Sequence, residues 1–287
     1  MRCELGKSSA RILLQQGSWC QSVRGEKDAA EGPGGAARTL LYDSHMNLRE
    51  MVDSVPHWYH RFEFAPGVVT PGTNDARAVI EKLNLPRDMG GLRVLDIGAR
   101  DGFFSFECER RCAKEVVPID YVPPEQTGFY VAKQVLGSRL NLVHETVYNL
   151  TPERYGRFDI VLFLGVLYHL PDPLRALEIV FRMMRPQGWL FLETIAIDNE
   201  LPPEVAQLPL MRFYPKSTKN LDFTNFWGMT QACVIALLEE CGFCCLSNQC
   251  EGERAIFTAV KTSENKQASP ELGWEVRSSD NAYAKPG

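Results

Sequence analysis

An alternation of short apolar runs and helical segments between residues 92 and 261 constrains the fold more than any other feature of this sequence. The expected strands are residues 92–97, 115–119, 140–144, 158–164, 189–195, 243–247 and 255–261. Helices are expected at residues 103–113, 125–136 and 230–241, and another begins at Pro173 and ends at Pro186 and Gly188. This order predicts a doubly wound, mostly parallel α/β sheet of seven strands with an antiparallel closing strand.

The two ends of the chain lack this pattern. We expect residues 46–262 to form one domain, with an irregular, aromatic-rich insertion at residues 198–228. Residues 1–45 are weakly patterned and residues 263–287 are polar and aperiodic. We therefore predict a disordered leader and a disordered tail.

Hydropathy and charge exclude some functions. The longest apolar run covers residues 160–168, whereas a membrane span needs roughly 18 residues. No signal peptide is evident either, so we expect a cytoplasmic protein that does not enter a membrane. The formal net charge is −5, which is unlike a protein that binds nucleic acid through phosphate contacts alone.

Four of the nine cysteines cluster at residues 241–250. A zinc site usually shows two separated C-x-x-C pairs, or one such pair with histidines, and no histidine lies near this cluster. We therefore predict buried, reduced thiols and no metal site.

The loop after the first strand carries two glycines and is flanked by acids. Residues 96–102 read D-I-G-A-R-D-G, in which Gly98 and Gly102 allow a tight turn and a close approach to a ligand. Asp120 ends the second strand, where a carboxylate can bind a ribose diol. A dinucleotide needs a middle glycine where Arg100 stands, whereas S-adenosylmethionine (SAM) has no phosphate and suits the carboxylate of Asp96. A glycine turn without a cofactor is the remaining alternative.

Longer motifs extend this pattern to a family resemblance. The motifs are VLDIGARDG, VVPID, FDIVLFLGVLYHLPDPLRAL and GWLFLETIAID. Together they resemble a class I SAM-dependent methyltransferase, which implies a Rossmann-like fold. More narrowly, GVLYH, the LET-x-x-ID strand end and the MRFY insertion resemble the carboxymethyltransferase of the tRNA wobble uridine and its shorter single-domain relatives. The resemblance covers about residues 55–261.

The resemblance implies roles for individual residues. It implies Asp96, Gly98 and Gly102 at the amino-acid end of SAM, and Asp120 at the ribose. Tyr148 and Asn149 are implied at the adenine, and Gly165 and Tyr168 at the transferred group. In the tRNA enzyme the tyrosine of the GVLYH motif contacts the carboxylate of carboxy-SAM, and Tyr168 matches that tyrosine.

The remaining candidates concern the acceptor, and each has a structural alternative. His169 is a candidate general base beside Tyr168, or a packing residue. The cluster at residues 57–61 is a substrate lid or an amphipathic edge strand. The insertion is an acceptor pocket or a capping flap. The substrate-binding candidates in these two segments are Trp58, His60, Arg61, Arg212, Tyr214 and Trp227.

These residues predict a SAM-dependent methyltransferase that acts on a small-molecule or glycan acceptor, at oxygen. The alternative is transfer to the tRNA wobble uridine, either of a carboxymethyl group from carboxy-SAM or of a methyl group from SAM. A third alternative is a SAM-binding partner protein without catalysis. The acidic net charge favours the small acceptor over tRNA.

Overall fold

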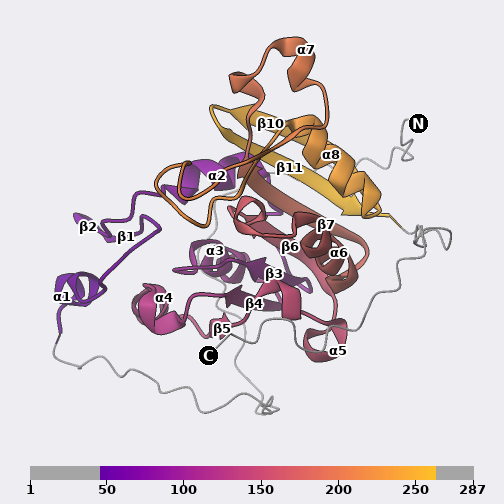
Figure 1. Ribbon diagram of the computed structural model, residues 1–287. Helices are drawn as coiled ribbons and strands as arrows, with labels where there is room; N and C mark the ends of the chain where they lie inside the picture. The colour runs from indigo at the N-terminus through magenta and orange to yellow at the C-terminus, as the bar shows by residue number, and fades with distance from the viewer. Residues whose placement is uncertain (1–45, 263–287) are drawn as a thin grey trace, which may run out of the picture.

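The computed structural model describes residues 46–262, and this part of the chain is built around one seven-stranded sheet (Figure 1). The strands are β3 (Arg93–Ile97), β4 (Glu115–Asp120), β5 (Val143–His144), β6 (Phe158–Leu164), β7 (Met184–Ile195), β10 (Phe243–Glu251) and β11 (Arg254–Lys261). Their order across the sheet is β10-β11-β7-β6-β3-β4-β5. The strands from β7 to β5 are parallel, and β11 is antiparallel to both of its neighbours. The predicted α/β sheet with an antiparallel closing strand is confirmed.

Helices cover both faces of the sheet (Figure 1). The α-helices of the described residues are α1 (Leu48–Asp53), α2 (Ala76–Leu83), α3 (Phe103–Arg110), α4 (Phe129–Leu136), α5 (Pro152–Tyr155), α6 (Pro173–Met183), α7 (Pro203–Ala206) and α8 (Gln231–Glu240), of which α1 and α7 lie away from the sheet (Figure 1). Leu95 and Ile97 pack in one apolar cluster with α6 and α8, whereas Val94 packs in another with α2 and α3. Because successive side chains of a strand point to opposite faces, each parallel strand must be apolar throughout.

Two small hairpins lie outside the main sheet. They pair β1 (Glu63–Ala65) with β2 (Val68–Val69), and β8 (Met211–Phe213) with β9 (Trp227–Met229). The second hairpin belongs to the insertion predicted at residues 198–228, and its last strand ends at Met229. The predicted disorder of residues 1–45 and 263–287 lies outside the described residues. Within residues 46–262 no helix is long and apolar enough to cross a membrane.

The boundary between α6 and β7 differs from the prediction. α6 ends at Met183, so Pro186 and Gly188 lie inside β7 rather than at the end of the helix. The register of β6 against β7 shifts between Phe158 and Ile160, and a Cβ on Gly188 would come within 3.1 Å of the Asp159 carbonyl oxygen. Proline and glycine therefore mark an irregularity in strand pairing here rather than the end of a helix. Both residues are tolerated at such irregularities as well as at helix ends.

Candidate active site

A cavity of about 1860 Å³ opens at the carboxyl ends of the parallel strands. Its wall includes Gly98 after β3, Asp120 at the end of β4, Thr146 after β5 and Gly165 after β6. This is where open α/β sheets bind ligands. Pockets for one small ligand measure roughly 300–1,000 Å³, so this cavity has room for a cofactor and an acceptor together.

The structure brings about half of the predicted site residues to this cavity. The residues on its wall are Gly98, Asp120, Tyr148, Gly165, Tyr168, His169 and His60. Those that do not line it are Asp96, Gly102, Asn149, Trp58, Arg61, Arg212, Tyr214 and Trp227.

The glycine loop folds back onto the end of β4. The N–H groups of Gly98 and Ala99 both donate to the Ile119 carbonyl oxygen at 2.9 Å. Gly98 has a φ of +81°, and a Cβ there would lie 2.4 Å from Cγ2 of Val166. Arg100 also has a positive φ of +53°, in the region that glycine adopts most readily. Gly98 thus lies at the cavity wall in a position with little space for a larger side chain.

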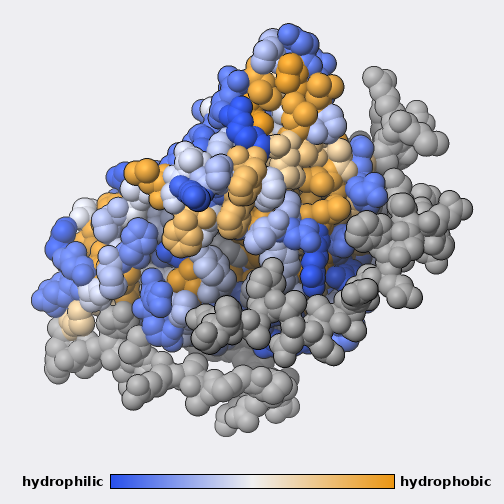
Figure 2. Space-filling view, viewed as in Figure 1, coloured by the Kyte–Doolittle hydropathy of each residue, from blue (hydrophilic) through white to orange (hydrophobic). Residues whose placement is uncertain are grey.

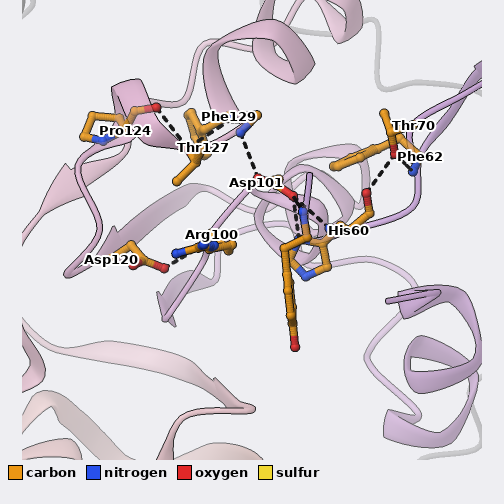
Figure 3. Close-up of polar contacts among 11 residues, drawn as sticks. His60, Phe62, Thr70, Arg100, Asp101, Asp120, Pro124, Thr127 and Phe129 are labelled. Atoms are coloured by element: carbon orange, nitrogen blue, oxygen red, sulfur yellow. Dashed lines mark hydrogen bonds and ion pairs between the residues drawn. The ribbon is translucent and has the colours of Figure 1, made fainter. Parts of the chain in front are cut away.

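Asp120 presents a carboxylate whose two oxygens are both fixed. Oδ2 accepts the N–H of Arg100 at 2.8 Å (Figure 3). Oδ1 accepts the N–H of Val122 at 2.7 Å. Burial raises the pKa of Asp120, and these two backbone donors oppose the rise. Each oxygen keeps a further lone pair, so the rigid carboxylate can accept hydrogen bonds from the two hydroxyls of a ribose.

Asp96 and Gly102 lie behind the loop. The buried Asp96 carboxyl accepts the hydroxyl proton of Ser105 on α3 at 2.5 Å, and burial raises its pKa to about 7. A Cβ on Gly102 would lie 2.7 Å from the rings of Phe106 and Phe129. In this structure both residues hold the loop against the helices.

Asp101 joins the glycine loop to the segment before it in the chain. This fully buried carboxylate accepts the N–H groups of Tyr59 at 2.7 Å and His60 at 2.8 Å, and that of Gly128 at 2.8 Å (Figure 3). It thereby fixes Tyr59 and His60 on the cavity wall. Burial lowers the pKa of His60 to about 4, so its imidazole is neutral at pH 7.

Tyr168 belongs to a polar cluster beside Gly165. Arg254 of β11 forms an ion pair with the buried Glu193 of β7, with 2.6 Å between Nη2 and Oε2. The Nη1 group of Arg254 donates to the Tyr168 hydroxyl oxygen at 3.2 Å. Burial raises the pKa of Tyr168 to about 12, so the phenol keeps its proton and can donate it in a hydrogen bond.

His169 is oriented by the insertion. Its Nδ1 lies 3.1 Å from the Thr224 carbonyl oxygen and 2.9 Å from the Thr224 hydroxyl oxygen. The hydroxyl of Thr224 in turn donates to Asp222 at 2.6 Å. A carbonyl oxygen only accepts, so Nδ1 carries the proton and Nε2 keeps a lone pair. Burial lowers the pKa of His169, which favours this neutral form.

The two predicted tryptophans support the cavity wall from behind, whereas Arg212 lies on the surface. Trp58 is buried, and its indole N–H donates to the Val52 carbonyl oxygen at 2.9 Å. The indole N–H of Trp227 donates to the Leu170 carbonyl oxygen at 2.9 Å. Arg212 pairs with Glu200 on the surface.

The rim of the cavity carries exposed apolar side chains from the insertion. Leu221 is 93% exposed and Phe223 is 77% exposed, and they flank Asp222 on the wall. Further exposed apolar residues of the insertion are Leu208, Leu210 and Phe213. Figure 2 shows orange surface around α7 and α8 at the top of the view. Exposed apolar side chains therefore stand next to the polar wall residue Asp222.

A family model described as a methyltransferase domain matches residues 50–233, which is more than half of the chain. The chain belongs to this methyltransferase family. A tRNA U34 carboxymethyltransferase from Aliarcobacter butzleri is 27% identical over 197 residues, covering 66% of this chain and 58% of the relative. A ubiquinone biosynthesis O-methyltransferase from Xanthomonas oryzae pv. oryzae is 32% identical over 108 residues, covering 38% and 45%. The chain thus spans about half the length of the curated relatives that it matches.

Among solved structures, the N-terminal domain of EvdMO1 with SAH bound superposes on this methyltransferase with a TM-score of 0.54. The two are 19% identical, over 78% of this chain and all of that chain, so the likeness shows the fold alone. The predicted methyltransferase class is confirmed by the family match. The residues present fit SAM, because the glycine loop and the Asp120 carboxylate meet at one wall of a cavity large enough to hold it.

Sequence reasoning missed several polar residues of this methyltransferase site. Glu193 stands in the LET motif, so its position at the end of a strand was a usable signal. Arg254 and the Thr224–Asp222 pair carried no such signal, because they reach the site through the closing hairpin and an irregular insertion. Near the predicted adenine site, Asn149 donates to Glu145 at 2.9 Å, and Glu145 rather than Asn149 lines the cavity.

Proposed function

We propose that this methyltransferase transfers a methyl group from SAM to a hydroxyl oxygen of a small-molecule or glycan acceptor. The observation that carries the proposal is the orientation of His169. Its Nδ1–H points at Thr224, and its Nε2 makes no hydrogen bond with a described residue. An imidazole held in this tautomer on a cavity wall has the form of a general base.

The cofactor side of the proposal rests on the strand ends. SAM supplies a methyl carbon that its sulfonium activates. Asp120 would accept the ribose hydroxyls, and Gly98 and Gly165 would let the backbone approach the amino-acid end and the transferred group. Tyr148 would lie beside the adenine. Rigid attachment of these groups favours a reactive alignment of donor and acceptor, which is the main source of rate in a displacement of this kind.

The acceptor side rests on His169. Burial keeps its imidazole neutral near pH 7, so Nε2 can take the proton of an acceptor hydroxyl as the carbon–oxygen bond forms. Asp222 stabilises the imidazolium that results, because its charge raises the pKa of His169 against the larger effect of burial. The Tyr168 hydroxyl is a protonated neighbour that can donate a hydrogen bond to the acceptor.

A second candidate is carboxymethyl transfer to the tRNA wobble uridine. It is favoured by the names of the similar proteins and by the contact between Arg254 and Tyr168, which would suit a carboxylate on the transferred group. Glu193 already neutralises Arg254, however, and a carboxylate would have to share the guanidinium with it. We therefore place methyl transfer first.

Mass spectrometry of the ligand that co-purifies with the protein separates the two candidates. We expect SAM or S-adenosylhomocysteine. Carboxy-SAM would contradict the proposal and support the tRNA reaction.

Transfer of label from [methyl-³H]SAM into metabolite, glycan and tRNA fractions then tests the acceptor. We expect label in the metabolite or glycan fraction with the wild type. His169→Gln should lower the rate by roughly 10²–10⁴-fold, the usual contribution of a general base. Label in tRNA nucleosides, or an unchanged rate in His169→Gln, would refute the corresponding part of the proposal.

A further inference from the structure

Three lysine or arginine side chains of the described residues line the cavity: Lys82, Arg100 and Arg254. Lys82 pairs with Glu251, and Arg254 pairs with Glu193. The guanidinium of Arg100 makes no hydrogen bond or ion pair with any residue in the described range 46–262. The hydrogen bond between Arg100 and Asp120 comes from the backbone N–H of Arg100. Arg100 is therefore the lysine or arginine of this wall that forms no ion pair. Its charge lowers the pKa of the nearby Asp120, against the larger effect of burial, but both oxygens of that carboxylate already accept backbone N–H groups.

The acids on the same wall already have partners. Asp75 pairs with Arg77, Glu145 with Arg154, and Glu253 with Lys219. Asp120 accepts two backbone N–H groups, and Asp222 accepts the N–H and hydroxyl of Thr224. Arg100 is half-buried, and a partly desolvated cation without a counter-ion is unfavourable. The arrangement points to an anion supplied from outside the chain.

The backbone of Arg100 reinforces this conclusion. Its φ of +53° lies in the region that glycine adopts without cost and that other residues adopt rarely. Residues held there against their preference occur most often where a ligand or a reaction needs them. Eight non-glycine residues of the described range have a positive φ, and Arg100 is the one that stands in the glycine loop on the cavity wall.

Arg100 shares the cavity with Asp120 and with the proposed base His169. Its N–H is bonded to Asp120 at the end of β4 (Figure 3). Burial is the main cause of the lowered pKa of His169, and the charge of Arg100 lowers it further. Burial likewise raises the pKa of Tyr121, and Arg100 opposes that rise. Arg100, Asp120 and His169 line the same cavity, so an anion bound to Arg100 would share that cavity with the cofactor and the proposed base.

We propose that Arg100 binds a carboxylate or phosphate group of the acceptor, so that the acceptor carries an anionic group besides its reactive hydroxyl. This inference rests on the proposed function. A guanidinium suits either anion because it donates two parallel hydrogen bonds. Binding the anion would neutralise the guanidinium and leave the acceptor hydroxyl on the side of His169.

Inorganic phosphate is the probe, titrated into the full-length protein saturated with S-adenosylhomocysteine and followed by ³¹P NMR. We expect phosphate to bind to this binary complex. Arg100→Gln should weaken phosphate binding by at least about tenfold, the scale of a lost charged hydrogen bond. Arg100→Lys should retain part of the affinity. Arg139→Gln, which removes an exposed arginine away from the cavity, is the matched control and should change nothing.

Three outcomes would overturn the proposal. Phosphate binding that is absent, or equally strong in Arg100→Gln, means that Arg100 holds no anion. Mutual exclusion of phosphate and S-adenosylhomocysteine means that Arg100 binds the carboxylate of the cofactor. Tight binding of bulk tRNA that falls steeply with salt and is lost in Arg100→Gln means that the anion is a nucleic-acid phosphate. Phosphate binding needs no turnover, so a negative result here is separate from a failure of methyl transfer.

Discussion

The carboxylate of Asp101 should hold one wall of the cavity in place, and Asp101→Asn tests this. The side chain is fully buried and accepts three backbone N–H groups, from Tyr59, His60 and Gly128. An asparagine has one carbonyl oxygen, so its NH₂ group must face at least one of these donors. Each hydrogen bond to a charged group contributes about 1.5–3 kcal/mol, and one loss should lower the free energy of unfolding by that amount. For a domain of this size the melting temperature should fall by about 3–12 °C.

Thermal unfolding measures the size of this effect, and hydrogen exchange shows where it acts. The amides of Tyr59 and His60 should exchange faster in Asp101→Asn, while those of β6 keep their protection until global unfolding. Asp53→Asn, an exposed position on α1, is the control and should melt with the wild type. An Asp101→Asn protein that melts within 1 °C of the wild type, with Tyr59 and His60 equally protected, would refute the role of Asp101.

Asp120→Ala should weaken S-adenosylhomocysteine binding by about 1–3 kcal/mol, measured by calorimetry, because it removes the fixed acceptor proposed for the ribose; unchanged affinity would contradict this assignment. Gly98→Ala should destabilise the protein in chemical denaturation, since its Cβ would come within 2.4 Å of Val166 at a φ of +81°; a stability equal to the wild type would show that the loop relaxes easily. Asp96 has its pKa raised by burial to about 7 from an ordinary value of 3.8, so the folded state holds its proton more tightly than the unfolded state. The Asp96 contribution should therefore lower stability as pH rises from about 4 through 7. Asp96→Asn should flatten this dependence in denaturation curves taken across that range, and an unchanged slope would count against it.

The strands of the sheet could be predicted because each is recognised from residues that are close together in the sequence. A strand buried on both faces must be apolar along its length, so β3, β6 and β7 were visible as continuous runs. The loop at Gly98 was visible because few residues other than glycine tolerate a positive φ close to another side chain. Asp120 followed from its place at the end of β4. These features depend on neighbours within a few residues, which the sequence displays directly.

The partners of the catalytic candidates could not be predicted, because they are far apart in the chain. Tyr168 meets Arg254 only because β11 pairs with β7 in a register that places Arg254 opposite Ile195. His169 meets Thr224 because an irregular loop returns to the turn after β6. No periodicity encodes either contact. The same limit explains why Trp58 looked like a substrate residue, although its ring lies in the core.

The proposed acceptor side of the cavity is assembled from three separate segments, and each is bonded to the proposed cofactor side. The backbone at Tyr59 and His60 is bonded to Asp101, and the N–H of Phe226 donates to the Tyr168 carbonyl oxygen at 2.9 Å. The third tie is the ion pair of Arg254 with Glu193. In the first two segments the bonds involve backbone N–H groups, and in the third they involve one ion pair. Other side chains of these segments can therefore change without moving the cofactor loop. Acceptor choice in this methyltransferase should therefore also depend on His57 and on residues 220–223, whose exchange should alter the acceptor and leave S-adenosylhomocysteine affinity unchanged.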